Sequence, residues 1–123
     1  MTQPNIPTQL LADCHHLGWL HASAVLLNRN AAVPWFILVP QTQMHDVLDL
    51  PDDQREAILA ECAAVSRFIK QQLGFDKVNF AGLGNVVSVM HLHIIGRHSK
   101  DPCWPQPVWG NLPLGEPYAP EQL

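Results

Sequence analysis

Hydrophobic residues between positions 51 and 74 recur at the three- or four-residue spacing of an α-helix. The apolar stripe consists of Ile58, Cys62, Val65, Ile69 and Leu73. Asp52 and Asp53 open the segment, where acidic side chains suit the positive end of a helix, and Gly74 is typical of the left-handed residue that ends one. The pattern therefore predicts one long amphipathic helix whose apolar side packs against the rest of the fold.

Outside this segment, the pattern predicts a shorter helix and four strands. The helical spacing of Leu10, Leu11, Cys14 and Leu17, followed by Gly18, indicates an N-terminal helix over residues 8–17. Runs rich in β-branched and other large apolar residues predict strands at residues 22–27, 35–39, 78–83 and 86–95.

Two short segments between these strands favour turns. Asn28, Arg29 and Asn30 separate the first two strands, and the glycine-containing residues 82–85 separate the last two. Both connections are local, which favours antiparallel pairing. We therefore predict an α+β fold, with a mostly antiparallel sheet, one long helix on one face of it and a shorter N-terminal helix.

The composition is that of one folded domain over residues 1–123. Hydrophobic residues make up 47% of the chain, and a chain of this size buries roughly two thirds of its unfolded surface. Cys14, Cys62 and Cys103 are odd in number, widely spaced and without a CxxC pair, so we expect reduced thiols and neither a disulfide framework nor a zinc knuckle.

The charge argues against a nucleic-acid partner, and the apolar runs argue against a membrane segment. A net charge of −4 with 15% charged residues leaves no basic stripe for a phosphate backbone, so we expect no binding to DNA or RNA. The first residues carry no basic segment followed by an apolar one, and no apolar run approaches the roughly 20 residues that span a membrane. We expect a cytoplasmic protein without a membrane segment.

The C-terminal residues 97–123 differ in kind from the rest of the chain. They hold more than half of the eleven prolines and two of the four tryptophans, Trp104 and Trp109. Proline excludes a regular helix or a central strand, and exposed indoles are costly in water. We expect an extended arm that packs on the same chain or on a second subunit.

His91 and His93 are the candidate catalytic residues. They lie two positions apart in the apolar run 86–95, so a strand would place both on one face, with Met90, Leu92 and Ile94 on the other. Two adjacent imidazoles form a site of two groups that can titrate near neutral pH.

Three chemistries could use this pair. The imidazoles could bind a metal, with His98 as a third ligand. One could act as a general base for a nucleophile, although Ser88 points to the opposite face and no GxSxG motif is present. Finally, one imidazole could itself attack a phosphorus centre while the other donates to the phosphate oxygens, which needs no further residue type.

The run Val89-Met90-His91-Leu92-His93-Ile94-Ile95 resembles the His-φ-His-φ-His-φ-φ signature of the histidine triad superfamily, with Val89 in place of the first histidine. Residues 26–29 and 35–40 look like the first hairpin of that family, and the predicted long helix lies where the family has one. The segment 83–87, Arg97 and residues 104–110 look most like a small bacterial branch of it.

The resemblance implies a homodimer that hydrolyses or transfers nucleotidyl groups at the α-phosphate, acting on nucleoside phosphoramidates or dinucleoside polyphosphates. His91 falls on the family's nucleophile and His93 on the third histidine, which contacts the phosphate. Asn28 and Asn85 fall on positions near the bound nucleotide, although each also suits a turn. The expected ligand is a purine nucleotide or a nucleotide-derived substrate, with no metal or other cofactor.

Two positions depart from the family pattern. Val89 cannot form a side-chain hydrogen bond, so whatever the first histidine does must come from elsewhere or be missing. Trp35 stands where many members carry a histidine behind the nucleophile, and an indole donates but cannot accept. The alternatives to an enzyme are therefore a catalytically weak or inactive nucleotide-binding module and, less favoured, a metal-binding module.

Overall fold

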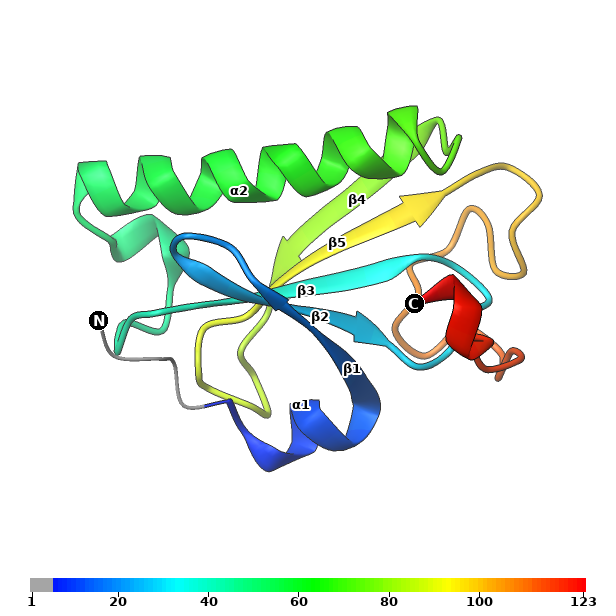
Figure 1. The fold of residues 1–123 in the computed structure, drawn as a ribbon, viewed down its shortest axis with the longest axis horizontal. Helices are drawn as coiled ribbons and strands as arrows, with labels where there is room; N and C mark the ends of the chain where they lie inside the picture. Colours follow the sequence, from blue (N-terminus) through cyan, green and yellow to red (C-terminus); the bar gives the residue numbers. More distant parts are fainter. Residues whose placement is uncertain (1–5) are drawn as a thin grey trace.

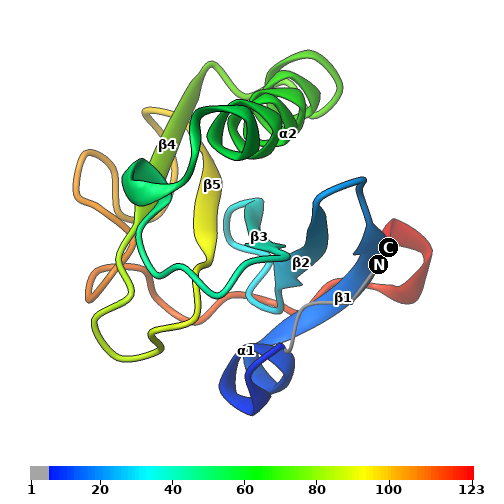
Figure 2. The ribbon, with the colours of Figure 1, turned by 90° about the vertical axis from the view of Figure 1, so that its left-hand side faces the viewer.

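The computed structural model describes residues 6–123, which form one five-stranded antiparallel sheet with a long helix on one face and a short helix near the other (Figures 1 and 2). The elements in chain order are α1 (Thr8–Asp13), β1 (Cys14–Trp19), β2 (Ser23–Asn28), β3 (Trp35–Pro40), η1 (Val47–Asp49), α2 (Asp52–Gln71), β4 (Lys77–Gly82), β5 (Leu92–Arg97) and η2 (Pro120–Gln122). The predicted α+β class is confirmed. No helix of the described residues is long and apolar enough to cross a membrane.

The strands lie in the order β1-β2-β3-β5-β4, and every neighbouring pair is antiparallel. The predicted antiparallel pairing of β2 with β3 and of β4 with β5 is confirmed. The four-residue turn predicted at residues 82–85 is wrong, because residues 83–91 connect β4 to β5. The two pairs join along β3 and β5, where Ile37 lies opposite His93. This long-range pairing places the histidine-bearing strand next to the centre of the sheet.

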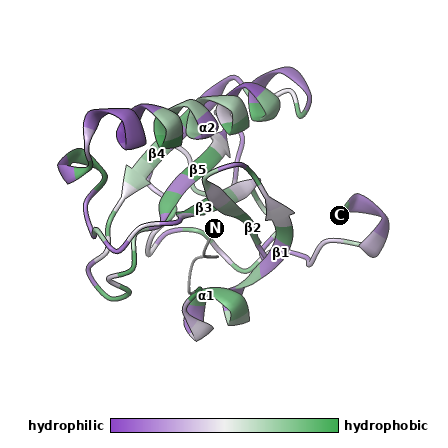
Figure 3. Ribbon diagram, turned by 60° about the vertical axis from the view of Figure 1, so that its left-hand side comes forward, coloured by the Kyte–Doolittle hydropathy of each residue, from purple (hydrophilic) through white to green (hydrophobic). Residues whose placement is uncertain are grey.

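The long helix α2 covers one face of the sheet as its apolar stripe predicts. Ile58, Cys62, Val65 and Ile69 are all buried, and hydrophobic and hydrophilic residues alternate around the helix (Figure 3). The helix ends at Gln71, and Gly74 then takes the expected left-handed conformation with φ +79°. The core beneath the helix also contains Leu27, Phe36, Leu38, Leu50, Met90, Leu92 and Ile94. Leu73 lies beyond the helix end and is 42% exposed.

The three cysteines of the chain are free and buried. Burial raises the pKa of the Cys62 thiol to about 12 and, with the nearby Asp13 carboxylate, that of Cys14 to about 11. At neutral pH both therefore remain protonated and behave as small apolar core side chains.

The predicted N-terminal helix is too long. Residues 8–13 are helical, but Cys14–Trp19 forms β1, which the sequence analysis did not predict. Cys14 pairs with Asn28 and Trp19 with Ala24, so β2 supplies backbone partners for this segment. This pairing outweighs the helical spacing of Cys14 and Leu17, because short helices are only marginally stable by themselves.

The strand predicted over residues 86–95 begins later, at Leu92. Continuing the β3–β5 register would place Pro40 opposite Met90, and proline has no N–H to extend the ladder. On the other side, Gly84 with φ +69° turns the chain out of β4. Residues 83–91 therefore form a loop, and His91 directly precedes β5. The alternation of faces nevertheless persists, since Met90 and Leu92 both face the core under α2.

Replacement of Gly96 by alanine should destabilise the fold by about 1–3 kcal/mol, the usual cost of overpacking a core. A Cβ atom at this position would lie 2.6 Å from Cγ of Pro34 and 2.8 Å from Cγ2 of Ile69, so β5 could not stay as close to α2. Urea unfolding measures the loss. Gly82→Ala is the matched control, because its Cβ would meet only the flexible end of Leu92, at 3.0 Å. An equal loss in the two variants would contradict this account.

The C-terminal residues after β5 pack on their own chain. Cys103 and Val108 are buried with Val33 and Ile95 in a separate core cluster. Further along, the Asn30 side chain donates to the carbonyl of Pro113 and accepts from the amide of Gly115, both at 3.0 Å. The turn between β2 and β3 thus holds the far end of this C-terminal arm, residues 98–123.

The near end of the arm is held by a buried ion pair between Arg97 and Asp101. Their side chains are 2% and 0% exposed, and Nε of Arg97 lies 2.7 Å from Oδ2 of Asp101. The guanidinium also donates to Oδ1 of Asp101 at 3.1 Å, to Asn79 at 3.0 Å and to the carbonyl of Gln106 at 2.8 Å. Arg97 therefore joins β5, β4 and the arm.

Candidate active site

His91 and His93 lie side by side on the face of the sheet opposite α2. Their ring centroids are 5.1 Å apart and the rings are nearly perpendicular, at 68°. They are 8% and 5% exposed, so water has little access to either ring, and hydrogen bonds and charges act more strongly there than in solvent. The structure thus brings together the two residues that the HxH spacing singles out.

A backbone hydrogen bond fixes the tautomer of His91. Its Nδ1 lies 2.7 Å from the carbonyl oxygen of Val89. A carbonyl can only accept, so Nδ1 carries the proton. In the neutral ring, Nε2 is then unprotonated and presents a lone pair that can act as a nucleophile. The carbonyl group of residue 89 thereby orients His91, although its side chain has no polar atom.

His93 carries the opposite tautomer. The Nε1–H of Trp35 donates to Nδ1 of His93 at 3.0 Å, so Nδ1 must accept and the neutral ring carries its proton on Nε2. Burial, with a smaller contribution from His91, lowers the pKa of His93 to about 4. At neutral pH His93 is therefore an uncharged donor. The indole of Trp35 thus contacts the second histidine of the pair.

Trp109 of the C-terminal arm also reaches the site. Its ring is 4.9 Å from that of His93 and 5.5 Å from that of Trp35, nearly perpendicular to both. The sequence predicts that Trp109 lies in an arm, but it does not predict this contact with the histidines. Nothing in the local pattern of residues 97–123 could reveal this contact, because it depends on the path of the arm.

The side chain of Val89 packs against apolar residues on the histidine-bearing side of the sheet. Val89 and Val87 lie against a cluster formed by Leu10, Cys14, Ala24, Leu26, Ile37 and Val39. The position that would hold the first histidine of the triad is thus part of a small second core between the loop 83–91, α1 and the sheet.

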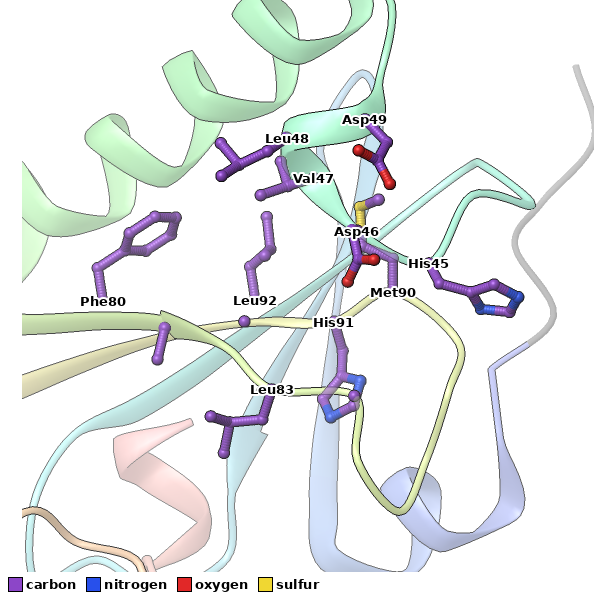
Figure 4. A pocket seen from close by; sticks show the side chains of 13 residues that line it. His45, Asp46, Val47, Leu48, Asp49, Phe80, Leu83, Met90, His91 and Leu92 are labelled. Atoms are coloured by element: carbon purple, nitrogen blue, oxygen red, sulfur yellow. The ribbon is translucent and has the colours of Figure 1, made fainter.

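A cavity of about 480 Å³ lies beside His91, between η1 and the end of β4. Figure 4 shows that the His91 ring turns away from Asp46 and Leu92, which lie on the α2 side. His45 lines the same cavity and donates from Nδ1 to the carbonyl of Ser88 at 2.7 Å. The exposed His45 thus tethers the loop that carries Val89.

Asn28 and Asn85 have no contact that separates a ligand role from a turn role. Oδ1 of Asn28 accepts from the amide of Asn30 at 2.9 Å, which stabilises the β2–β3 turn. By the strand register, Asn28 lies on the same face as His93, two strands away. Asn85 is exposed in the loop between β4 and β5. Their contact with a nucleotide stays a prediction.

The remaining candidates for phosphate or metal binding are engaged elsewhere. Arg97 is neutralised by Asp101. Nδ1 of His98 accepts from the amide of Lys100 at 3.1 Å, and its ring packs 5.4 Å from that of Phe75. Among residues 6–123, no three His, Cys, Asp or Glu side chains come together in a group that could hold a metal ion.

Comparison with known proteins gives consistent matches. The model of the HIT domain family matches residues 10–100. A histidine triad protein from Marinobacter aquaeolei VT8 is 40% identical, with a TM-score of 0.89 over 98% of this chain and 88% of that one. A histidine triad protein from Bradyrhizobium japonicum is 37% identical, with a TM-score of 0.82 over 94% of this chain and 84% of that one. A histidine triad protein from Sinorhizobium meliloti 1021 is 33% identical, with a TM-score of 0.89 over 96% of this chain and 87% of that one. No curated protein matches the chain.

Proposed function

Because the chain belongs to the histidine triad family, we propose that it is a nucleotide hydrolase or nucleotidyl transferase that acts at the α-phosphate through His91. Membership of the family supports a nucleotide-binding, hydrolase-type activity. The observation that supports attack by His91 is the hydrogen bond from its Nδ1 to the Val89 carbonyl, which leaves Nε2 free to attack.

The proposed reaction has two displacement steps at phosphorus. In the first, the Nε2 lone pair of His91 forms a bond to the α-phosphorus, and the bond to the leaving group breaks. The leaving group departs with the electron pair and takes a proton from solvent. In the second, water attacks phosphorus, loses a proton to solvent and displaces His91, which releases a nucleoside monophosphate. For transfer, another hydroxyl group takes the place of water.

His93 supports both steps as a hydrogen-bond donor. Its Nε2–H is the free donor of the ring, since Nδ1 is occupied by Trp35. Negative charge on the non-bridging oxygens is redistributed in each displacement, and a preorganised donor in a water-poor site stabilises it. A neutral donor suits this role because its protonation does not change near neutral pH.

Val89 is the residue that bears most on the choice between an enzyme and a weak or inactive nucleotide-binding module. The apolar side chain gives no hydrogen bond to a phosphate, which favours the catalytically weak or inactive nucleotide-binding module. The carbonyl of the same residue, however, orients the nucleophile without a side chain. We therefore favour the enzyme.

Hydrolysis of an adenosine phosphoramidate and of a dinucleoside polyphosphate, each with and without a chelator, tests the function. We expect turnover of at least one substrate, unchanged by the chelator, because imidazole attack needs no metal-activated water. Binding of a mononucleotide without turnover of either substrate would favour the binding module. Complete loss of activity with the chelator, restored by zinc, would favour a metal-dependent site.

We also propose a homodimer, formed at the outer edge of β4. This strand pairs with β5 on one side only, and Phe80 is 48% exposed there. Next to it lies an apolar cavity of about 250 Å³ lined by Leu59, Cys62, Ala63, Ser66, Val78, Phe80 and Ile94. An open edge beside apolar side chains is a ready surface for a second copy. Trp109 gives no support for the dimer, since it packs on Trp35 of its own chain.

Sedimentation should show a dimer at micromolar concentration, and Phe80→Lys should shift it towards the monomer by placing a charge on the edge. Leu114→Lys is the control, because Leu114 is 98% exposed and lies far from β4 in the sequence, on the C-terminal arm. A wild-type monomer would refute the dimer, and a Phe80→Lys dimer of unchanged affinity would refute this interface.

A further inference from the structure

The ring of His93 is held by two indoles that come from distant parts of the chain. Trp35 begins β3, and Trp109 belongs to the C-terminal arm. The ring centroid of His93 is 5.9 Å from that of Trp35 and 4.9 Å from that of Trp109, and the two indoles are 5.5 Å apart. The three rings thus form one aromatic cluster beside the nucleophile.

Trp35 controls the protonation of His93 because an indole N–H can only donate. The 3.0 Å contact between Nε1 of Trp35 and Nδ1 of His93 requires a lone pair on Nδ1. The Nδ1–H tautomer and the imidazolium ion both carry a proton there, so either would place two donors against each other. The contact therefore admits the neutral Nε2–H tautomer alone.

Trp109 closes the cluster and is itself fixed by the arm. Val108, its neighbour, is 3% exposed. Upstream, the pair Arg97–Asp101 anchors the beginning of the arm to β5. Perpendicular packing of Trp109 on both rings restricts the rotation of each and covers them from water.

We infer that Trp35 and Trp109 are positioning residues for the reaction: Trp35 fixes His93 as a neutral ring with its proton on Nε2, and Trp109 holds that ring in place. The inference rests on the proposed function, since it assigns the Nε2–H of His93 to the phosphate oxygens. An unrestrained imidazole exchanges tautomers and takes up a proton near neutral pH, and either change would alter the donor that the phosphate meets. His91 is the titratable group that lies against His93 and adds to the effect of burial.

NMR of the ring nitrogens in the ligand-free protein, with Trp35→Phe as the variant, tests the inference. Phenylalanine keeps an aromatic ring but removes the N–H. The wild type should show the Nε2–H tautomer of His93 and no protonation at pH 6. In the variant, the titration midpoint of His93 should rise by about one pH unit or more, since nothing then opposes a proton on Nδ1.

Single-turnover hydrolysis gives the second readout. Trp35→Phe should lower the rate about tenfold, less than the loss of a whole preorganised donor, while mononucleotide affinity changes less than about threefold. Trp109→Leu should raise the His93 midpoint in the same direction, because it admits water to the ring. Trp19→Phe is the control, since Trp19 ends β1 and packs against His16, outside the cluster.

An Nδ1–H tautomer in the wild type would overturn the inference, and this test holds even if the variants fail to fold. So would a Trp35→Phe variant with an unchanged His93 midpoint and an unchanged rate. If the wild type turns over neither substrate but the midpoint shifts as expected, the proposed function fails and the control of His93 by Trp35 stands.

Discussion

Replacement of His91 by alanine should lower the single-turnover rate by about 10⁴-fold or more, the scale on which removal of a catalytic nucleophile acts in other enzymes. The expectation follows from the free Nε2 of His91, whose other ring nitrogen is committed to the Val89 carbonyl. Mononucleotide affinity should stay within about tenfold, because binding and bond cleavage use different interactions.

Rapid-quench kinetics with a labelled substrate measures this loss, and calorimetry measures the affinity. His21→Ala is the matched control, since this exposed histidine lies between β1 and β2, outside the candidate site. A His91→Ala protein that retains the wild-type rate would show that another group attacks phosphorus.

Asp101→Asn should destabilise the protein by about 3–5 kcal/mol, because it leaves the buried Arg97 charge without its partner. A loss of this size is a large part of the total stability of a small domain. The variant should also lose activity, since the pair anchors the arm that carries Trp109 to His93.

Chemical denaturation compares Asp101→Asn with Asp52→Asn. Asp52 also pairs with an arginine, Arg55, but its side chain is 89% exposed, so its loss should cost less than about 1 kcal/mol. The double variant Arg97→Met, Asp101→Leu should lose less than Asp101→Asn, because it removes both charges together. Equal losses of stability in Asp101→Asn and Asp52→Asn would refute the stabilising role of the buried Arg97–Asp101 pair.

The contribution of Asp101 to the stability of the fold should depend on pH. Burial raises the pKa of Asp101, but hydrogen bonds from Arg97 and from the amides of His98 and Cys103 outweigh burial and lower the pKa overall. A carboxyl group whose pKa is lower in the folded state stabilises the fold above its unfolded pKa and loses that contribution as the pH falls through the folded value. The stability difference between the wild type and Asp101→Asn should therefore shrink below about pH 4.

The elements that could be predicted from the sequence are those whose own residues carry the signal. The stripe of α2 and the HxH spacing are local patterns, and both led to the observed arrangement. β1 was missed because Cys14–Trp19 becomes a strand through its pairing with β2, not through its own alternation. The start of β5 was misplaced because it depends on Pro40 of another strand.

The candidate site was predicted only where one short stretch of the sequence supplies it. His91 and His93 follow from the spacing, but their tautomers depend on a backbone carbonyl and on Trp35, which lies 58 residues from His93 in the sequence. The contact of Trp109 with His93 and the burial of the Arg97–Asp101 pair depend on the path of an arm without periodicity. Such contacts are set by tertiary packing, so no local pattern indicates them.

Mass spectrometry of the intact protein during a single turnover tests the central claim most directly. With a nucleoside phosphoramidate, the account predicts a transient mass increase of one nucleotidyl group, which peptide mapping places on His91 and which disappears as the nucleoside monophosphate forms. The adduct should be absent in His91→Ala. Formation of the monophosphate with no adduct at any time, or with an adduct on another residue, would contradict the account.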